Sequence, residues 1–113
     1  MAKTVLIVED DPLLACASAA LIEDEFGYAP TTVESSSAAM PVVERGVDLA
    51  LLDIEVADGV TFALAAKLRA QGTPVVFVSG SDPSRVPNDL AATPFLQKPV
   101  MPKQLLAAAR QYL

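Results

Sequence analysis

Side chains that can bind metals and phosphates follow four separate apolar segments of the chain, each at the point where the segment ends. An acidic run at residues 9–11 follows the first segment, and Asp53 follows a later one. Ser79 and Lys98 follow the last two of these segments. If the segments are parallel strands, their carboxyl ends lie on one edge of a sheet and the side chains converge on one site.

The carboxylates of this group point to a cation site. Two carboxylates about 4 Å apart repel by roughly 4 kcal/mol at an effective dielectric constant of 20. A stable fold must therefore bind a cation beside Glu9, Asp10 and Asp53, or protonate one of them. Oxygen ligands suit Mg²⁺ or Mn²⁺. Zinc is disfavoured because the chain has no His and only one Cys.

Asp53 is the best candidate for a nucleophile, since it ends a wholly apolar run in the middle of the predicted sheet. A carboxylate can attack phosphorus and form an aspartyl phosphate. The Lys98 ammonium and the Ser79 hydroxyl could then bind phosphoryl oxygens. Each residue alone has an ordinary alternative as a helix start, a strand cap, a loop serine or a surface lysine. Their joint placement after strands one, three, four and five favours the chemical interpretation.

Apolar runs and helix-like segments alternate along the chain, which predicts an α/β fold with a parallel sheet and helices on both faces. Strands are expected at Val5–Val8 and at residues 28–33, 49–53, 74–78 and 95–96. Helices are expected from an Asp11 cap and Pro12 to Phe26, at residues 35–44 and 61–70, and from Pro102 onward.

Several positions should weaken or interrupt this pattern. Pro41 should shorten or kink the second helix, because proline removes a helical hydrogen bond. Pro83 and Pro87 should leave any helix in residues 81–93 short or mobile. Cys16, which has no partner, is expected to be a small buried apolar residue.

Length and charge limit the classes of protein to which the chain can belong. Its 113 residues predict one domain, 1–113, and 52% of them are apolar. A net charge of −6 argues against binding to nucleic acids or anionic membranes. No apolar stretch reaches about 18 residues, and residues 1–4 lack a signal-peptide layout. A single unpaired Cys favours a cytoplasmic location.

These residues resemble a known family. Residues 5–14, Val-Leu-Ile-Val-Glu-Asp-Asp-Pro-Leu-Leu, and residues 48–53, Asp-Leu-Ala-Leu-Leu-Asp, are similar to the opening strand and the phosphoacceptor strand of response regulator receiver domains. Ser79 falls at that family's Ser/Thr position, and Lys98-Pro99 at its lysine–proline pair. The match covers essentially the whole chain.

The resemblance implies a flavodoxin-like (CheY-like) three-layer α/β/α fold with five helices and a five-stranded parallel sheet of order 2-1-3-4-5. It also implies the metal ligands. Glu9 and Asp10 would hold Mg²⁺ (or Mn²⁺), and Asp53 with the backbone carbonyl of Glu55 would complete the protein ligands.

The resemblance further implies a phosphoryl switch. Asp53 would accept a phosphoryl group from a histidine kinase or histidine phosphotransfer protein, and Ser79 and Lys98 would bind it. Ser79 and Phe95 would occupy the switch positions, and the face around the fourth and fifth strands and their helices would change its protein contacts. The Lys98-Pro99 bond would be cis, which proline allows.

The chain departs from the family pattern in places. Residues 53–59 lack the usual Met-Pro pair, and Phe95 replaces a Tyr or His that can form hydrogen bonds. The sequence from Phe77 to Gly80 is similar to that of an alphaproteobacterial group of stand-alone receivers, the FAT GUY subfamily. Val78 and Ser79 stand where that motif has Ala-Thr.

The predicted function is therefore that of a phospho-accepting receiver that acts on an unknown downstream protein as a monomer or weak dimer. It would be a single-domain regulator or a piece of a longer hybrid kinase or effector. Three alternatives are a small Mg²⁺-dependent phosphatase or phosphotransferase, a receiver-like module that is never phosphorylated, and a flavodoxin. The first strand lacks the phosphatase Asp-x-Asp motif and a flavodoxin phosphate loop, and the complete set of site residues argues against the unphosphorylated module.

Overall fold

One parallel sheet organises the molecule, which is described as a computed structural model over residues 3–113. Its strands are β1 (Val5–Val8), β2 (Thr31–Val33), β3 (Leu49–Leu52), β6 (Val75–Ser79) and β7 (Phe95–Gln97). They lie in the order β2-β1-β3-β6-β7, which confirms the predicted flavodoxin-like order 2-1-3-4-5. The helices are α1 (Pro12–Phe26), α2 (Ser36–Arg45), α3 (Phe62–Ala70) and α4 (Pro102–Arg110). Met1 and Ala2, part of the predicted domain 1–113 and of the stretch without a signal-peptide layout, lie outside the described residues.

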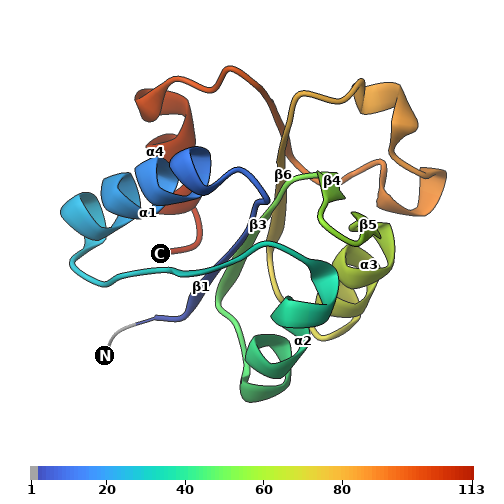
Figure 1. Ribbon diagram of the computed structural model, residues 1–113, viewed down its shortest axis with the longest axis horizontal. Coiled ribbons are helices and arrows are strands. Elements are labelled where there is room, and N and C mark those ends of the chain that lie inside the picture. The colour runs from blue at the N-terminus through green and yellow to red at the C-terminus, as the bar shows by residue number, and fades with distance from the viewer. Residues whose placement is uncertain (1–2) are drawn as a thin grey trace.

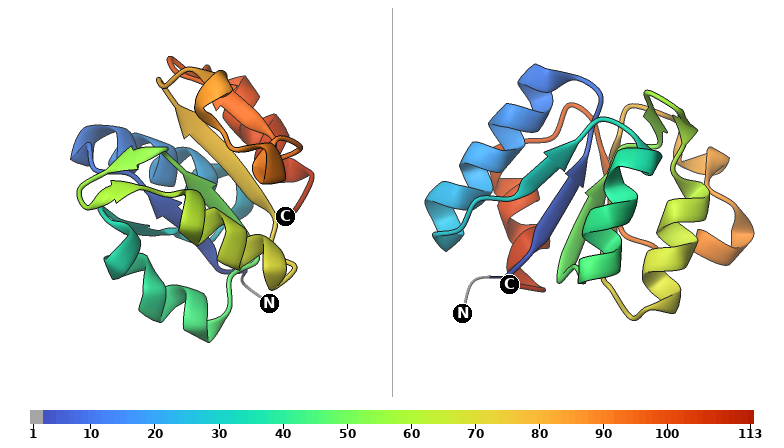
Figure 2. Two further views of the ribbon diagram at one scale, coloured as in Figure 1. Left: turned by 90° about the vertical axis from the view of Figure 1, so that its right-hand side faces the viewer. Right: turned by 60° about the horizontal axis from the view of Figure 1, so that its bottom comes forward.

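Helices cover both faces of the sheet, with α1 and α4 on one face and α2 and α3 on the other (Figure 1 and Figure 2). Side chains of a strand alternate between faces, and β1 follows this rule. Val5 and Ile7 pack in the cluster that includes Ile22 of α1. Leu6 and Val8 pack in the opposite cluster with α2 and α3. All four β1 side chains are buried, as a strand covered on both faces requires.

The first helix begins and ends at the predicted residues. The Asp11 carboxylate accepts hydrogen bonds from the backbone N–H groups of Leu13 and Leu14, which satisfies donors that the first helical turn leaves free. Gly27 ends the helix at a φ of 85°, a left-handed conformation that glycine adopts without strain.

The expected shortening of the second helix at Pro41 is wrong, and the expected kink stays a prediction. Helix α2 starts after its Ser35 cap and continues past Pro41 to Arg45. Proline removes the hydrogen bond to the carbonyl four residues earlier, that of Ser37. Both Pro41 and Ser37 are exposed, so water can reach this carbonyl and the helix tolerates the loss.

Strand boundaries differ from the predicted ones by up to three residues. The second strand begins at Thr31 instead of residue 28, and the third ends at Leu52, one residue before Asp53. A hairpin that the sequence did not predict follows Asp53, with β4 (Glu55–Val56) antiparallel to β5 (Gly59–Val60). Its strands are too short to show an alternating pattern in the sequence.

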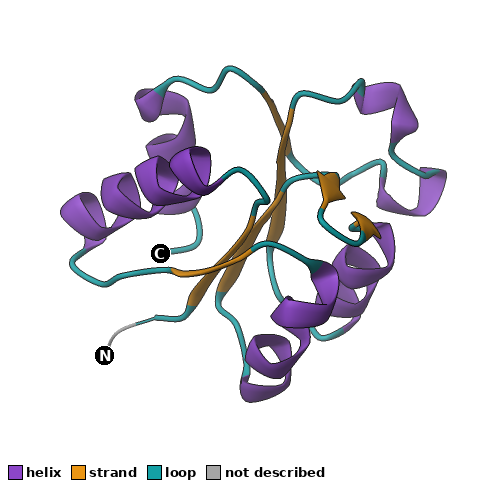
Figure 3. Cartoon of the chain, in the orientation of Figure 1, coloured by secondary structure: helices purple, strands orange, loops and turns teal. Residues whose placement is uncertain are grey.

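Residues 81–93 form two single turns where the family pattern implies a fourth helix. The turns are η1 (Pro83–Arg85) and η2 (Asn88–Leu90), both 3-10 helical (Figure 3). The expectation of five helices is therefore wrong for residues 3–113, which hold four α-helices, while the expectation that any fourth helix is short is confirmed by the two 3-10 turns. Leu90 is the buried apolar anchor of these turns.

Cys16 is exposed on α1, so the expectation that it is buried is wrong. Helix α1 buries Ala15 and Ile22, which turns Cys16 away from the sheet. No helix within residues 3–113 is long and apolar enough to cross a membrane.

Candidate functional site

The strand register brings the predicted site residues to one edge of the sheet. Val8 pairs with Leu52 on the adjacent strand, so Glu9 and Asp53 leave the sheet side by side. An open pocket of about 470 Å³ lies at this edge. Its lining consists of Asp10, Asp53, Glu55, Ser79, Gly80, Ser81 and Lys98.

Lys98 joins the carboxylates of this site. Its Nζ donates hydrogen bonds to Glu9 Oε1 and, at 2.9 Å, to Asp53 Oδ2. Burial alone would lower the pKa of Lys98, but the bonds to Glu9 and Asp53 outweigh burial and raise the pKa. The lysine therefore remains charged beside the two carboxylates at neutral pH.

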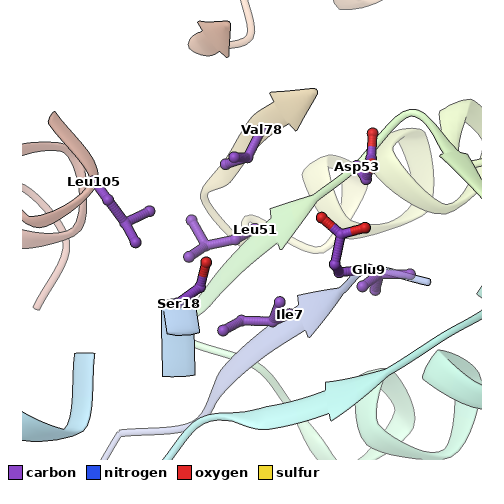
Figure 4. A pocket seen from close by; sticks show the side chains of 8 residues that line it. Ile7, Glu9, Ser18, Leu51, Asp53, Val78 and Leu105 are labelled. Atoms are coloured by element: carbon purple, nitrogen blue, oxygen red, sulfur yellow. The ribbon is translucent and has the colours of Figure 1, made fainter. Parts of the chain in front are cut away.

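Glu9 stands at the border between this polar site and the core. Figure 4 shows Glu9 at the end of β1 and Asp53 at the end of β3, with Ile7 and Leu51 lining the same small pocket. Burial raises the pKa of Glu9, since a carboxylate loses hydration here, and the hydrogen bond from Lys98 offsets part of that effect. The Asp53 carboxylate also repels Glu9, and a second positive charge beside them would relieve this repulsion.

The backbone around Asp53 is held on both sides. The N–H of Ile54 donates to Asp53 Oδ1 at 2.7 Å, which orients the carboxylate. The hydroxyl of Thr61 donates to the Asp53 carbonyl oxygen at 2.7 Å, and the Thr61 N–H donates to the Ile54 carbonyl at 2.9 Å. Thr61 is fully buried, so these bonds are shielded from water.

The acidic residues fit a hard divalent cation. Glu9, Asp10 and Asp53 each offer a carboxylate oxygen, and these oxygens lie within 4.8 Å of one another. All three donors are oxygens, the type that Mg²⁺ and Mn²⁺ prefer. Asp10 is exposed and Glu9 is buried, so the cluster opens toward solvent on the side of Asp10. Glu55 lines the adjoining pocket, and its backbone carbonyl stays a predicted ligand.

Most of the sequence matches a family model. That model, described as the response regulator receiver domain, covers residues 5–110. The chain belongs to this family.

Curated proteins and solved structures resemble this receiver domain over nearly its whole length. The sensory transduction protein RegX3 of Mycobacterium tuberculosis is 33% identical over 115 residues, which cover 97% of this chain and 50% of the relative. The chain thus spans about half the length of the curated relatives it matches. A receiver domain from Methylobacillus flagellatus superposes with a TM-score of 0.82 at 25% identity, covering 100% of both chains. SdrG from Sphingomonas melonis superposes with a TM-score of 0.81 at 31% identity, covering 97% of each.

Ser79 lies in the lining of the acidic pocket, whereas Phe95 packs against the adjoining core. Ser79 is buried, and its Oγ accepts a hydrogen bond from the Ser81 N–H at 3.2 Å, which leaves the hydroxyl proton available. Phe95 is half-buried and packs against Phe77, with ring centroids 6.2 Å apart. The Lys98-Pro99 bond is cis, as the family resemblance implies.

Three residues that sequence reasoning missed help to hold the receiver site. Thr61 donates to the Asp53 carbonyl, and its position at the start of a predicted helix was its sequence signal. Asp58 accepts from the backbone N–H groups of Ser36 and Ser37 at 2.8 and 3.0 Å, joining the hairpin to α2. Arg85 forms an ion pair with Glu55. The contacts of Asp58 and Arg85 join segments that are distant in the sequence, so no local sequence pattern predicts them.

Proposed function

We propose that this receiver domain accepts a phosphoryl group on Asp53 from the phosphohistidine of a histidine kinase or histidine phosphotransfer protein. The observation that carries this proposal is the double contact of Lys98 with Glu9 and Asp53 at the open edge of the sheet. It places a cation directly beside the proposed nucleophile, within a pocket that also holds Asp10 and Ser79. Membership of the receiver family supports a histidine kinase as the partner.

The transfer step moves the phosphoryl group between two side chains. A carboxylate oxygen of Asp53 forms a bond to phosphorus while the bond from phosphorus to the donor imidazole nitrogen breaks. The electron pair stays on that nitrogen, and the released imidazole is neutral because it carries a proton on its other ring nitrogen or takes one from solvent. The product is an aspartyl phosphate, so the domain modifies itself rather than turning over a free substrate.

The residues of the chain divide the remaining tasks. The Lys98 ammonium would exchange its hydrogen bond to the Asp53 carboxylate for one to a phosphoryl oxygen. The Ser79 hydroxyl would donate a hydrogen bond to another phosphoryl oxygen. Glu9, Asp10, Asp53 and the Glu55 carbonyl would hold Mg²⁺ or Mn²⁺. When bound, the ion supplies positive charge that offsets the phosphoryl oxygens.

The reporting surface would be the one formed by β6, the two 3-10 turns, β7 and α4. Ser79 ends β6 and Phe95 begins β7, so both switch positions lie next to residues 81–93. A phosphoryl group that recruits Ser79 would shift this segment between two arrangements. Phe95 has no hydroxyl group, so its part in the switch would be packing against Phe77 instead of hydrogen bonding.

Replacing the nucleophile tests the proposal. Asp53→Ala should abolish covalent labelling by acetyl phosphate or by a phosphohistidine donor in the presence of Mg²⁺, measured by intact-protein mass spectrometry. Asp24→Ala is the control, because it removes an exposed carboxylate on α1 that lies outside the pocket lining. Undiminished labelling of Asp53→Ala would contradict the assignment of the nucleophile.

The proposal holds for the domain whether it acts alone or within a longer chain. The curated relatives are about twice as long as the segment that matches. A receiver module joined to an effector or a hybrid kinase is therefore a second arrangement for the same phosphoryl chemistry. The single-domain regulator and the similarity to the FAT GUY subfamily remain predictions from the sequence.

A further inference from the structure

Arg85 sits at the rim of the pocket that holds Asp53. Its Nη1 donates to Glu55 Oε1 at 2.5 Å and to Ser81 Oγ at 3.2 Å. Both acceptors belong to the lining of the pocket, alongside Asp53 and Ser79. The guanidinium group therefore contacts two residues of the lining to which Asp53 also belongs.

The charges around the pocket are unbalanced. Asp10, Asp53 and Glu55 line it together with a single cationic residue, Lys98. Lys98 is already shared between Glu9 and Asp53. A phosphoryl group would add negative charge at this point, and Arg85 is the additional cation that already touches the pocket lining.

We propose that Arg85 is a phosphoryl-binding residue that pairs with Glu55 while Asp53 is unphosphorylated. When Asp53 is phosphorylated, the Arg85 guanidinium moves from the Glu55 carboxylate to the phosphoryl oxygens. This inference rests on the proposed phosphorylation of Asp53. It assigns to residues 81–93 a direct contact with the phosphoryl group, in addition to the contact through Ser79.

The exchange requires little reorganisation. The side chains of Arg85 and Glu55 are 40% and 65% exposed, and exposed ion pairs of this kind stabilise a protein only slightly. Arg85 ends the turn η1, whose own bonds are local. Arg85 donates one hydrogen bond to the singly charged Glu55 carboxylate, whereas a doubly charged phosphoryl group attracts the guanidinium more strongly and can accept two parallel N–H donors from it.

The test measures binding of beryllofluoride, a phosphoryl mimic that attaches to an aspartate carboxylate, by ¹⁹F NMR in saturating Mg²⁺. Arg85→Gln should weaken binding about 5- to 10-fold. Glu55→Gln keeps the backbone carbonyl, frees Arg85 and should tighten binding about 2- to 3-fold. The double variant should bind beryllofluoride as weakly as Arg85→Gln does, because Glu55→Gln acts only by releasing Arg85.

A second exposed pair supplies the control. Arg110 and Glu25 form an ion pair in which Nη2 and Oε1 are 2.7 Å apart, and neither residue lines the pocket. Their side chains are 57% and 44% exposed. Arg110→Gln removes the same charge and should leave beryllofluoride binding unchanged.

Three results would overturn the inference. The first is a shift in the same direction for Arg85→Gln and Glu55→Gln, which would make the pair a structural link only. The second is a Glu55→Gln effect that persists without Arg85, which would mean that the carboxylate acts through its charge alone. The third is an equal loss in Arg110→Gln. Absence of beryllofluoride binding in the unaltered protein would contradict the proposed function itself, so the two failures are distinguishable.

Discussion

The edge of the sheet around Asp53 and the adjoining residues 81–93 are held by different kinds of contact. At the edge, hydrogen bonds join residues far apart in the chain, and Lys98 contacts Glu9 across 89 positions and Asp53 across 45. Within residues 81–93 most bonds are local, such as those of the 3-10 turns and the Asp82 carboxylate, which accepts from Ser84 two positions later.

Under the proposed function, this difference would separate a receiving region, the edge around Asp53, from a reporting region, residues 81–93. Long-range bonds exist only in the folded chain, so the edge keeps its geometry until the whole domain unfolds. Local bonds can open and close without disturbing the sheet, and segments of that kind form the low-stability end of a structure. Two long-range hydrogen bonds, from Arg85 to Glu55 and from Gln97 Nε2 to the Ser81 carbonyl, link the two regions.

Removing Lys98 should have the largest effect on stability. Lys98→Ala leaves Glu9, only 8% exposed, and Asp53 without their cation, and should lower the free energy of unfolding by about 2 kcal/mol. Urea unfolding measures the loss, and millimolar Mg²⁺ should recover part of it by replacing the missing charge. Lys103→Ala, at an exposed site on α4, is the control. An equal loss in both variants would mean that the edge gains no stability from the bridging lysine.

Removing the hydroxyl of Thr61 should have an intermediate effect. Thr61→Val keeps the shape but leaves the Asp53 carbonyl without its donor, at a cost of about 1–2 kcal/mol. The displaced backbone should also slow labelling of Asp53 by acetyl phosphate. Thr73→Val is the matched control, since Thr73 donates to the Val47 carbonyl at 3.2 Å at the opposite end of the sheet. Slowed labelling in both variants would contradict a local role for Thr61.

Replacing Asp58 or Asp82, whose carboxylates accept hydrogen bonds from backbone N–H groups, should have the smallest effects on stability. The two variants compare the two regions directly. The hydrogen bond from the Ser36 N–H lowers the pKa of Asp58, and that from the Ser84 N–H lowers the pKa of Asp82, both from the usual 3.8. A lowered pKa in the folded state means that the contribution to stability is present above pH 3.8. It is lost as the pH falls through the folded-state pKa.

Asp58→Ala should therefore lower the urea midpoint at neutral pH, and its difference from the unaltered protein should close in acid. Asp82→Ala should move the midpoint less, because a bond across two residues can also form in the unfolded chain. Circular dichroism during urea titrations at several pH values checks both variants. A larger effect for Asp82→Ala would reverse the assignment of the two regions.

The sequence was sufficient to locate the receiving region because residue type and strand ends coincide there. Glu9, Asp53, Ser79 and Lys98 each end or follow an apolar run, and parallel pairing alone brings such positions together. The prolines at 83 and 87 were sufficient to predict a weak fourth helix. The roles of Thr61, Asp58 and Arg85 could not be predicted, since each depends on a partner that only the folded chain brings near. Exposure of Cys16 depended on the rotation of α1 against the sheet, which small apolar residues around the helix do not specify.

Hydrogen exchange with and without a phosphoryl mimic tests the division into receiving and reporting regions most directly. Beryllofluoride with Mg²⁺ should increase protection of the backbone amides of residues 82–91, while the amides of β1 and β3 should change little. Asp53→Ala should show no such increase. Equal protection of residues 82–91 in the two states would contradict the account.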